Sequence, residues 1–206
     1  MRGRTARILT HRFVPGAPLR RTPDEVNVEE PMSVHLDGTL VATTMRTPGD
    51  DFDLAVGYCH TEGLLAGAPV DRCRYCGTGS AVDSGFNAVT VETGGRAPAP
   101  TPRLTTTTSA CGICGSASLD ELRDRLDPLP GLAPYPPAVL AAAVESIVGE
   151  QPLFEATGGV HAAAAFDRAA APLVVREDIG RHNAVDKVVG RLLLDGDLPA
   201  HELGIY

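Results

Sequence analysis

Two cysteines in a glycine-rich loop are the clearest candidates for chemistry in this chain. Cys111 and Cys114 are separated by two residues and have glycines on both sides. Ser118 and Glu121 follow at the spacing of a capping box, which predicts that a helix begins directly after the loop. A helix N-terminus favours a thiolate, the reactive form of cysteine, and glycines let a bulky partner approach the backbone closely. The pattern favours a sulfur carrier, a dithiol redox pair or half of a metal site over a pair of buried thiols.

A second pair, Cys73 and Cys76, leaves a zinc site open as an alternative. Together with Cys111 and Cys114 it would complete a four-cysteine zinc site. However, 34 residues separate Cys76 from Cys111, which is longer than the usual spacing in zinc ribbons. We therefore interpret Cys73 and Cys76 as thiols at the end of a strand, and we expect Cys59 in the hydrophobic core.

A dense group of polar residues between Arg176 and Lys187 predicts a second site. Seven of these twelve residues are charged or histidine, and Gly180 falls where a strand is expected to turn into a helix. The N–H groups of a helix N-terminus bind anions, and Glu177 and Asp178 are placed to orient the basic groups. The predicted binding residues in this segment are Arg176, Asp178, Gly180, Arg181, His182, Asn183 and Lys187. The alternative is a solvated helix start held by ion pairs.

Two further observations extend the predicted site. Lys187 is the one lysine among the 18 lysines and arginines of the chain, so either a compact ammonium is needed there or it remains by chance. Gly158, Gly159 and His161 precede a run of alanines, and we include them as candidate binding residues. A histidine in such a place is as often structural as functional.

The composition is that of one large or two small globular domains. The chain has 206 residues, of which 43% are hydrophobic and 4% aromatic, so aliphatic side chains must fill the core. The net charge of −8 argues against a general nucleic-acid-binding protein, and no apolar run is long enough for a membrane span. Five cysteines without a signal peptide favour a reducing compartment. Six arginines precede the first acidic residue, Asp24, but Arg7–Val14 among them has the pattern of a strand rather than of a targeting peptide.

Hydrophobic periodicity and turn residues predict an α/β (α+β) fold around these groups. The expected strands are Arg7–Val14, Met32–Leu36, Thr39–Met45, Asn87–Thr93, Val160–Phe166 and Leu173–Arg176, and Leu203–Tyr206 is apolar enough to begin another. The expected helices are Thr47–Leu65, one from Ser118, Ala138–Glu150 and one opened by Gly180 with Val185, Val188, Val189 and Leu192 as its buried stripe. We expect an N-terminal α+β domain in residues 1–100, a cysteine loop and linker in residues 101–118, and an α/β layer in residues 119–206.

Four segments, in this order, resemble one protein family. They are Asp50–Leu65, Ser109–Gly115 (SACGICG), Thr157–Asp167 (TGGVHAAAAFD) and Val175–Gly190 (VREDIGRHNAVDKVVG). Together they are similar to the formate dehydrogenase accessory sulfurtransferases, the FdhD family, from about residue 30 to about residue 194. The last three segments are specific to that family.

The resemblance implies a cytoplasmic, homodimeric sulfurtransferase. Such a protein takes sulfur from a cysteine desulfurase and passes it to the molybdenum of bis-molybdopterin guanine dinucleotide, the cofactor that formate dehydrogenase then receives. The persulfide position of the family falls on Cys111, and Cys114 assists or resolves. The phosphates of the dinucleotide would then lie between Gly180 and Lys187, within reach of the cysteine loop.

The resemblance also implies a cytidine deaminase-like C-terminal layer beside a smaller N-terminal domain. The zinc ligands of the deaminases are not evident in the sequence, so neither deamination nor a metal site is implied. Family members usually continue past the position of Tyr206 into a cofactor-binding stretch, so we expect this chain to be a fragment or a shortened form. Cys59, His60 and Cys73 do not match the family pattern, and we assign them no role.

Two other functions remain as alternatives. A zinc-stabilised binding module would use all four cysteines of the two pairs and would contain close to one zinc ion per chain. A dithiol oxidoreductase would form a reversible disulfide between Cys111 and Cys114. No thioredoxin-like βαβ pattern surrounds that pair, which makes the oxidoreductase the weaker of the two.

Overall fold

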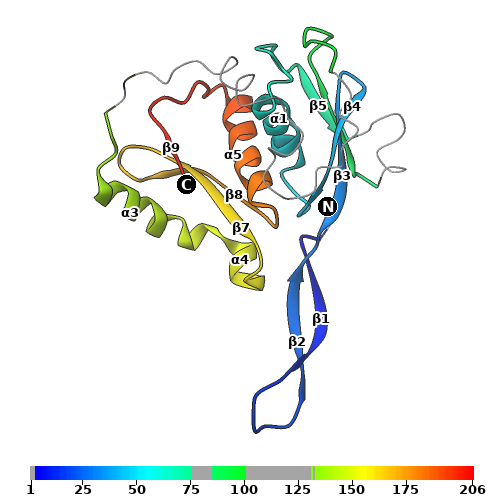
Figure 1. Ribbon diagram of the computed structural model, residues 1–206, viewed down its shortest axis with the longest axis vertical. Coiled ribbons are helices and arrows are strands. Elements are labelled where there is room, and N and C mark those ends of the chain that lie inside the picture. The colour runs from blue at the N-terminus through cyan, green and yellow to red at the C-terminus, as the bar shows by residue number, and fades with distance from the viewer. Residues whose placement is uncertain (1–2, 76–84, 101–130, 132) are drawn as a thin grey trace, which may run out of the picture.

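The chain forms a mixed α/β structure with several small sheets. The computed structural model describes residues 3–75, 85–100, 131 and 133–206. In these residues the strands form a two-stranded, a four-stranded and a three-stranded sheet. The two larger sheets lie on either side of a central pair of helices, α1 (Asp51–Thr61) and α5 (Arg181–Asp195) (Figure 1). The predicted fold class is confirmed at this level.

The four-stranded sheet contains the β-hairpin that the sequence predicts. Its strands, β3 (Glu30–Leu36) and β4 (Thr39–Arg46), are antiparallel. Asp37 and Gly38 join them with φ angles of 46° and 86°. An Asp-Gly pair accepts positive φ at low cost, which is why it marks the turn in the sequence.

Helix α1 covers one face of this sheet. β6 (Ala88–Glu92) pairs in parallel with β3 and antiparallel with β5 (Arg72–Tyr75), so the sheet order is β4-β3-β6-β5. A parallel pair needs a crossover connection, and α1 lies in the crossover. The core between helix and sheet consists of side chains with almost no exposed surface, namely Met32, Val34, Leu36, Leu54, Ala55, Val56, Cys59, Val89 and Val91. The prediction of Cys59 as a core residue is therefore confirmed.

The three-stranded sheet is built from the second half of the chain. β7 (His161–Phe166) lies between β8 (Pro172–Asp178) and β9 (Gly204–Ile205) and is antiparallel to both. The short final strand that the apolar C-terminal segment predicts is confirmed. α5 packs on this sheet through side chains that are buried with those of β7, namely Ala163, Ala165, Ala184, Val188 and Leu192.

The two central helices cross at a pair of glycines. A Cβ atom added to Gly57 of α1 would lie 1.8 Å from the carbonyl oxygen of Asp186, and one added to Gly190 of α5 would lie 1.8 Å from that of Asp53. Any larger residue would force the helices apart, so the glycines set the distance between them. The crossing joins the two sides of the predicted boundary near residue 100, and the division into domains stays a prediction.

The first two strands form an arm that projects from the rest of the molecule. β1 (Thr5–Arg12) and β2 (Arg20–Asn27) pair antiparallel over their full length (Figure 1). The arm is attached at its base, where the N–H of Val28 donates to the Arg4 carbonyl and Asn27 Nδ2 donates to Thr157 Oγ1 at 2.8 Å. β1 was expected from the sequence. β2 was not, because its polar sequence with Pro23 lacks the alternation of a half-buried strand.

Three other helical features differ from the predictions. The helix expected over Ala138–Glu150 is divided into α3 (Pro137–Ser146) and a 3₁₀ turn, Val148–Glu150. A short helix, α4 (Pro152–Thr157), follows, and its six residues are too few to show a helical period. In α5, Val185 is exposed, while Lys187 is buried beside Val188. Among the helices of the described residues, none is long and apolar enough to cross a membrane.

Candidate functional site

An ion pair without solvent contact lies inside the corner where β8 turns into α5, which we call the β8–α5 corner (Arg176–Lys187). Lys187 Nζ lies 2.8 Å from Asp178 Oδ2, and both side chains are fully buried. The same ammonium donates to the carbonyl oxygens of Thr47, at 3.1 Å, and Glu177, at 3.2 Å. All three N–H donors of the ammonium are therefore used, which is what a buried charge requires.

Asp178 also fixes the start of α5. Its Oδ1 accepts hydrogen bonds from the N–H of Gly180 at 2.9 Å and from Asn183 Nδ2 at 3.0 Å, and its Oδ2 accepts one from the N–H of Thr47 at 3.1 Å. Gly180 is the N-cap, with φ of −95° and ψ of 118°. This confirms the helix start that the sequence predicts, and it shows that Asp178 holds it in place.

Asn183 and Thr47 join the corner to the end of β4. Asn183 Nδ2 donates to the Met45 carbonyl at 2.8 Å, and Thr44 Oγ1 donates to Asn183 Oδ1 at 3.4 Å. In return, Thr47 Oγ1 accepts from the N–H of Ile179 at 3.1 Å. Backbone and side-chain groups from both halves of the chain thus hold the corner in one position.

Arg176 and Glu177, at the start of the corner, face neighbouring helices. Arg176 Nε and Nη2 lie 2.9 Å and 2.8 Å from Asp53 Oδ2 on α1. Burial raises the pKa of Asp53, and the hydrogen bond and charge of Arg176 oppose that rise. Glu177 accepts the N–H groups of Leu153 and Phe154 at 2.9 Å and 2.8 Å, and so caps the N-terminus of α4.

The structure divides the predicted binding residues into two groups. Arg181, His182, Gly158, Gly159 and His161 are exposed, and Gly180 is partly exposed. His161 is directly opposite Asp178 in the β7–β8 ladder, so the Gly158–His161 segment lies beside the corner. The exposed residues remain candidates for contact with a ligand.

The prediction that Asp178 and Lys187 contact a ligand is corrected, because both side chains support the corner from inside the protein. Their side chains are fully buried, and each atom that could bind a ligand is already engaged within the protein. Arg176 and Asn183, which the sequence also predicts as binding residues, hold Asp53 and Met45 respectively in this structure. The expectation that the acidic residues orient the basic ones is confirmed for Asp178 and Lys187.

Sequence reasoning missed a second buried ion pair, next to the corner. Arg46 at the end of β4 has no exposed surface, and its Nε and Nη2 each lie 3.0 Å from an oxygen of Asp51. Asn87 Oδ1 accepts from Arg46 at 3.0 Å, and the Tyr75 hydroxyl donates to Asp51 at 3.3 Å. The sequence does contain a signal for a buried Arg46. It is four residues after Ala42 and so lies on the same, inward face of β4.

The two cysteines within the described residues are unsuited to carry sulfur. Burial raises the pKa of the Cys59 thiol to about 12 and that of Cys73 to about 11, so both stay protonated at neutral pH. Cys73 lies on β5, where the sequence places it at a strand end. Cys76, Cys111, Cys114 and the helix expected from Ser118 lie outside the described residues. The four-cysteine zinc site therefore stays a prediction, and no group of three or more metal-ligating side chains occurs in the described part of the chain.

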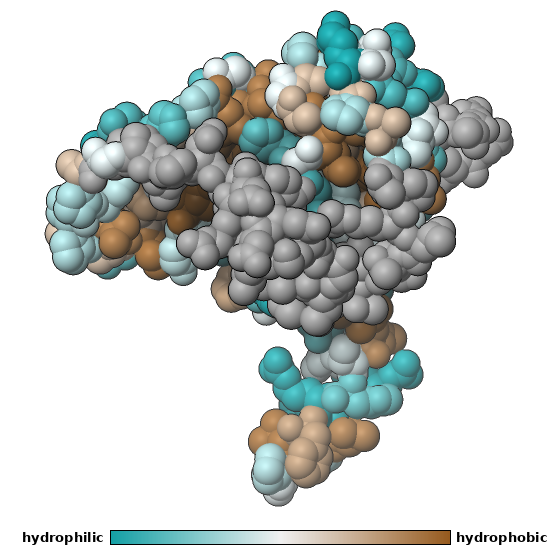
Figure 2. Space-filling view, turned by 45° about the horizontal axis from the view of Figure 1, so that its top comes forward, coloured by the Kyte–Doolittle hydropathy of each residue, from teal (hydrophilic) through white to brown (hydrophobic). Residues whose placement is uncertain are grey.

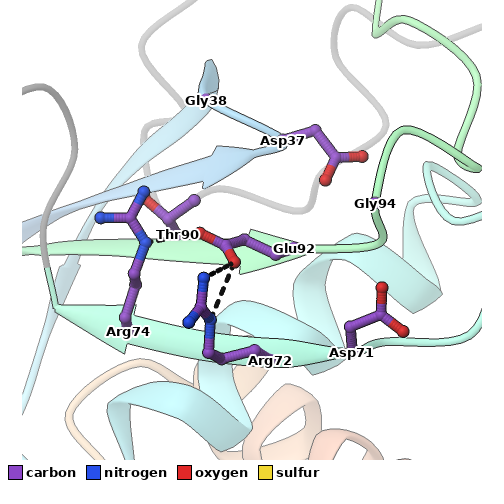
Figure 3. A pocket seen from close by; sticks show the side chains of 8 residues that line it. All are labelled: Asp37, Gly38, Asp71, Arg72, Arg74, Thr90, Glu92 and Gly94. Carbon is purple, nitrogen blue, oxygen red and sulfur yellow. Dashed lines mark hydrogen bonds and ion pairs between the residues drawn. The ribbon is translucent and has the colours of Figure 1, made fainter.

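A separate pocket of about 570 Å³ opens at the end of the four-stranded sheet, on β5 and β6 (Figure 3). Its lining includes Arg72 and Arg74, both of which bind Glu92, at 2.6 Å and 2.5 Å respectively. These two arginines lower the pKa of Glu92. None of the predicted binding residues lines this pocket, so we do not place the cofactor there.

A comparison with protein-family models identifies the family of this chain. The model described as "FdhD/NarQ family" matches residues 27–205. The chain belongs to the FdhD/NarQ family. The resemblance that the sequence motifs indicate is thereby confirmed. The match includes the CxxC loop and the β8–α5 corner, but it begins where the arm ends.

Several curated FdhD proteins are similar to this chain over most of its length. A sulfur carrier protein FdhD from Anaeromyxobacter dehalogenans (strain 2CP-1 / ATCC BAA-258) is 43% identical, over 84% of this chain and 62% of its own. Another from Nocardia farcinica is 44% identical, over 98% of this chain and 74% of its own. The chain thus spans about three fifths to three quarters of these relatives' length.

One solved structure shares the fold. The crystal structure of a proposed formate dehydrogenase accessory protein from Desulfotalea psychrophila matches 99% of this chain and 72% of its own, with a TM-score of 0.67 and 21% sequence identity. At that identity the likeness shows the fold alone. Because it extends over nearly the whole chain, the arm and the two larger sheets are all within the region that was compared.

Proposed function

We propose that this chain is a sulfur carrier, with Cys111 as the residue that holds the persulfide. The observation that carries the proposal is the family match over residues 27–205, which spans the glycine-bracketed Cys111 and Cys114, with relatives named sulfur carrier proteins. The raised pKa values of Cys59 and Cys73 support it, because a carrier needs an accessible thiolate and neither of these thiols provides one.

The first step of the proposed reaction is sulfur uptake. The Cys111 thiolate attacks the terminal sulfur of a persulfide on a cysteine desulfurase. The sulfur–sulfur bond of the donor breaks, its cysteine leaves as a thiolate, and Cys111 becomes the persulfide. No external oxidant or reductant is needed, because the bound sulfur keeps its oxidation state.

The second step delivers the sulfur. The Cys114 thiolate attacks Sγ of Cys111, the persulfide bond breaks, and a disulfide forms between the two cysteines. The outer sulfur leaves as sulfide with both electrons of the broken bond, and it becomes a ligand of molybdenum in bis-molybdopterin guanine dinucleotide. The dithiol of Cys111 and Cys114 supplies the two electrons, and an external thiol reductant must reduce the disulfide by thiol–disulfide exchange before the next cycle.

The molybdenum cofactor is the substrate in this proposal, and the β8–α5 corner would bind its phosphates. The exposed Arg181 offers positive charge, and both Arg181 and His182 offer N–H donors, at the first turn of a 15-residue helix. Lys187 and Asp178 would hold that turn rigid from below. Formate dehydrogenase would then receive the sulfurated cofactor in the cytoplasm, from a homodimer with a cytidine deaminase-like C-terminal layer.

Mass spectrometry tests the carrier residue directly. The protein is incubated with a cysteine desulfurase and cysteine, and species heavier by about 32 Da, the mass of one sulfur atom, are mapped to peptides. We expect the label on Cys111 in the wild type and in a Cys73→Ser control, and its loss in Cys111→Ala. Equal labelling of Cys111→Ala would refute the assignment, and about one zinc ion per chain would favour the four-cysteine zinc module instead.

A further inference from the structure

The arm exposes apolar side chains that nothing within the described residues covers. Ile8, Leu9 and Phe13 are 43%, 59% and 73% exposed, and Val14 and Leu19 in the connecting loop are 50% and 62% exposed. Figure 2 shows an apolar surface at the far end of the arm, in brown. A two-stranded hairpin is only marginally stable by itself in water, so one that projects this way gains from a partner.

The same end of the arm is strongly basic. In the β1–β2 register, Arg12 is directly opposite Arg20, and Arg21 is the next residue of β2. Like charges directly across a ladder are destabilising. An acidic surface against these arginines would offset their repulsion. The chain itself has such surfaces to offer, since its net charge is −8.

A surface with the opposite charge and a similar apolar content lies on α3 and the segment after it. Leu140 and Val144 are 46% and 36% exposed and lie one turn apart on α3, and Val148, 69% exposed, follows in the 3₁₀ turn after the helix. The exposed Glu145 and Glu150 accompany these side chains. Residues 137–160 contain three glutamates and no lysine or arginine. We call this surface the α3 stripe.

We infer that the arm of one molecule docks on the α3 stripe of a second copy of this chain. Apolar residues on both surfaces would be covered, and the arginines of the arm would face the glutamates of the stripe. Within one chain the arm points away from α3 (Figure 1), so its own stripe is out of reach. In the dimer we infer, two molecules exchange arms about a twofold axis, so the contact forms twice and the assembly closes.

This inference rests on the homodimer within the proposed function, but not on sulfur transfer. It names the contact that makes the dimer, and all of the arm except Asn27 lies before the family match. Persulfide formation on Cys111 is measured separately, so a failure of the docking model and a failure of the sulfur-carrier proposal are distinguishable.

Charge reversal and charge exchange test the contact. The dimer dissociation constant is measured by sedimentation equilibrium for wild type, for R12E/R20E, for E145R/E150R and for all four changes together. We expect each double variant to raise the constant by about tenfold or more, and the fourfold variant to restore it to within about threefold of wild type. The matched control, R72E/R96E, makes the same change in charge on β5 and in the segment after β6, and is expected to leave the dimer unchanged.

A photo-crosslink tests the contact without altering charge. Phe13 is replaced by benzoylphenylalanine in heavy-isotope protein, which is mixed with light protein and irradiated. We expect crosslinks between the heavy arm and light peptides from residues 137–157, and none to that segment when Phe86 carries the probe instead. A monomeric wild type, a dimer indifferent to both double variants, or crosslinks to another segment would each overturn the inference.

Discussion

Lys187 and Asp178 form a buried ion pair, 2.8 Å apart, that supports the first turn of α5 from inside the protein. Asp178 binds the N–H of Gly180 on the same side, so the ion pair and the helix start share one carboxylate. The one lysine of the chain is thus explained by geometry. Its ammonium is within hydrogen-bond distance of Asp178 Oδ2 and the carbonyl oxygens of Thr47 and Glu177, whereas a guanidinium is planar and larger.

Loss of this lysine is predicted to be strongly destabilising. In Lys187→Met the Asp178 carboxylate is left buried without its cation, and we expect the free energy of unfolding to fall by about 3–5 kcal/mol. Lys187→Arg is also expected to destabilise, because the larger head group must displace Thr47 or Glu177. Urea denaturation measures both, and Arg72→Met, at a side chain that is 67% exposed, is the control expected to change little.

The glycines at the crossing of α1 and α5 are predicted to tolerate no larger residue. A methyl group at Gly57 or Gly190 would meet a backbone carbonyl at 1.8 Å, so the helices must separate. We expect Gly57→Ala and Gly190→Ala each to lower the free energy of unfolding by at least about 2 kcal/mol. Gly149→Ala is the matched control, since a Cβ there has no neighbour within 4 Å. Unchanged melting of both crossing variants would contradict the close approach.

Asp186 is predicted to make stability depend on pH. Burial raises its pKa in the folded chain to about 6, despite the hydrogen bond from Thr61 Oγ1 at 2.9 Å. The unfolded chain ionises near its ordinary pKa of about 3.9. As pH rises between these values, the unfolded state loses its proton first, so stability falls through that window and is level above it.

The variant Asp186→Asn removes this titration and keeps an oxygen that can accept from Thr61. We expect the stability of the variant relative to wild type to increase as pH rises through the window, by on the order of 1–3 kcal/mol in total. Asp195→Asn serves as the control, because Arg191 lowers the pKa of Asp195. The ionised Asp195 carboxylate therefore stabilises the folded state, and this stabilisation is lost as the solution is acidified. Parallel stability curves for wild type and Asp186→Asn would contradict the assignment.

Native thiol labelling is predicted to spare Cys59 and Cys73. Their pKa values of about 12 and about 11 leave almost no thiolate near neutral pH. We expect iodoacetamide at that pH to alkylate both at least about tenfold more slowly than the same residues in denaturant. Peptide mapping by mass spectrometry measures the rates. Rapid native alkylation of Cys73 would return it to consideration as a carrier.

Arg181 and His182 are predicted to contribute to nucleotide binding. With guanosine diphosphate as the probe, we expect the double variant Arg181→Ala/His182→Ala to bind at least about tenfold more weakly, because two charge-assisted donors are lost. Arg168→Ala is the control, since Arg168 binds Glu202 at 2.6 Å on another surface. Isothermal titration calorimetry measures the affinity, and equal binding by the double variant would remove the corner from the cofactor site.

Turn residues and periodicity predicted most of the body of the molecule. Asp37-Gly38 marks the hairpin because its turn requires positive φ, and Gly180 marks the start of α5, where an added Cβ atom would lie 3.0 Å from Asn183 Nδ2. The β2 strand escaped prediction because both faces of the arm are exposed, so no alternation is present. Its strand conformation comes from pairing with β1, which composition alone does not show.

The candidate site was predicted as a region but not in the roles of its residues. A dense polar segment at a turn attracts attention, but the direction of each side chain depends on packing. Lys187 is three residues after Ala184 and directly before Val188, which places it on the buried stripe of α5. We expected Val185 in that stripe instead, because an apolar residue is the usual occupant.

The glycine crossing also limits how this chain can change over evolutionary time. At Gly57 the backbone of α1 is bare, and α5 packs against it; at Gly190 the reverse holds. A recombination event that separated the two helices would therefore leave each without its packing partner. A substitution in either helix is tolerated only where the other helix can still pack against it. The two halves of the chain are therefore expected to be inherited together.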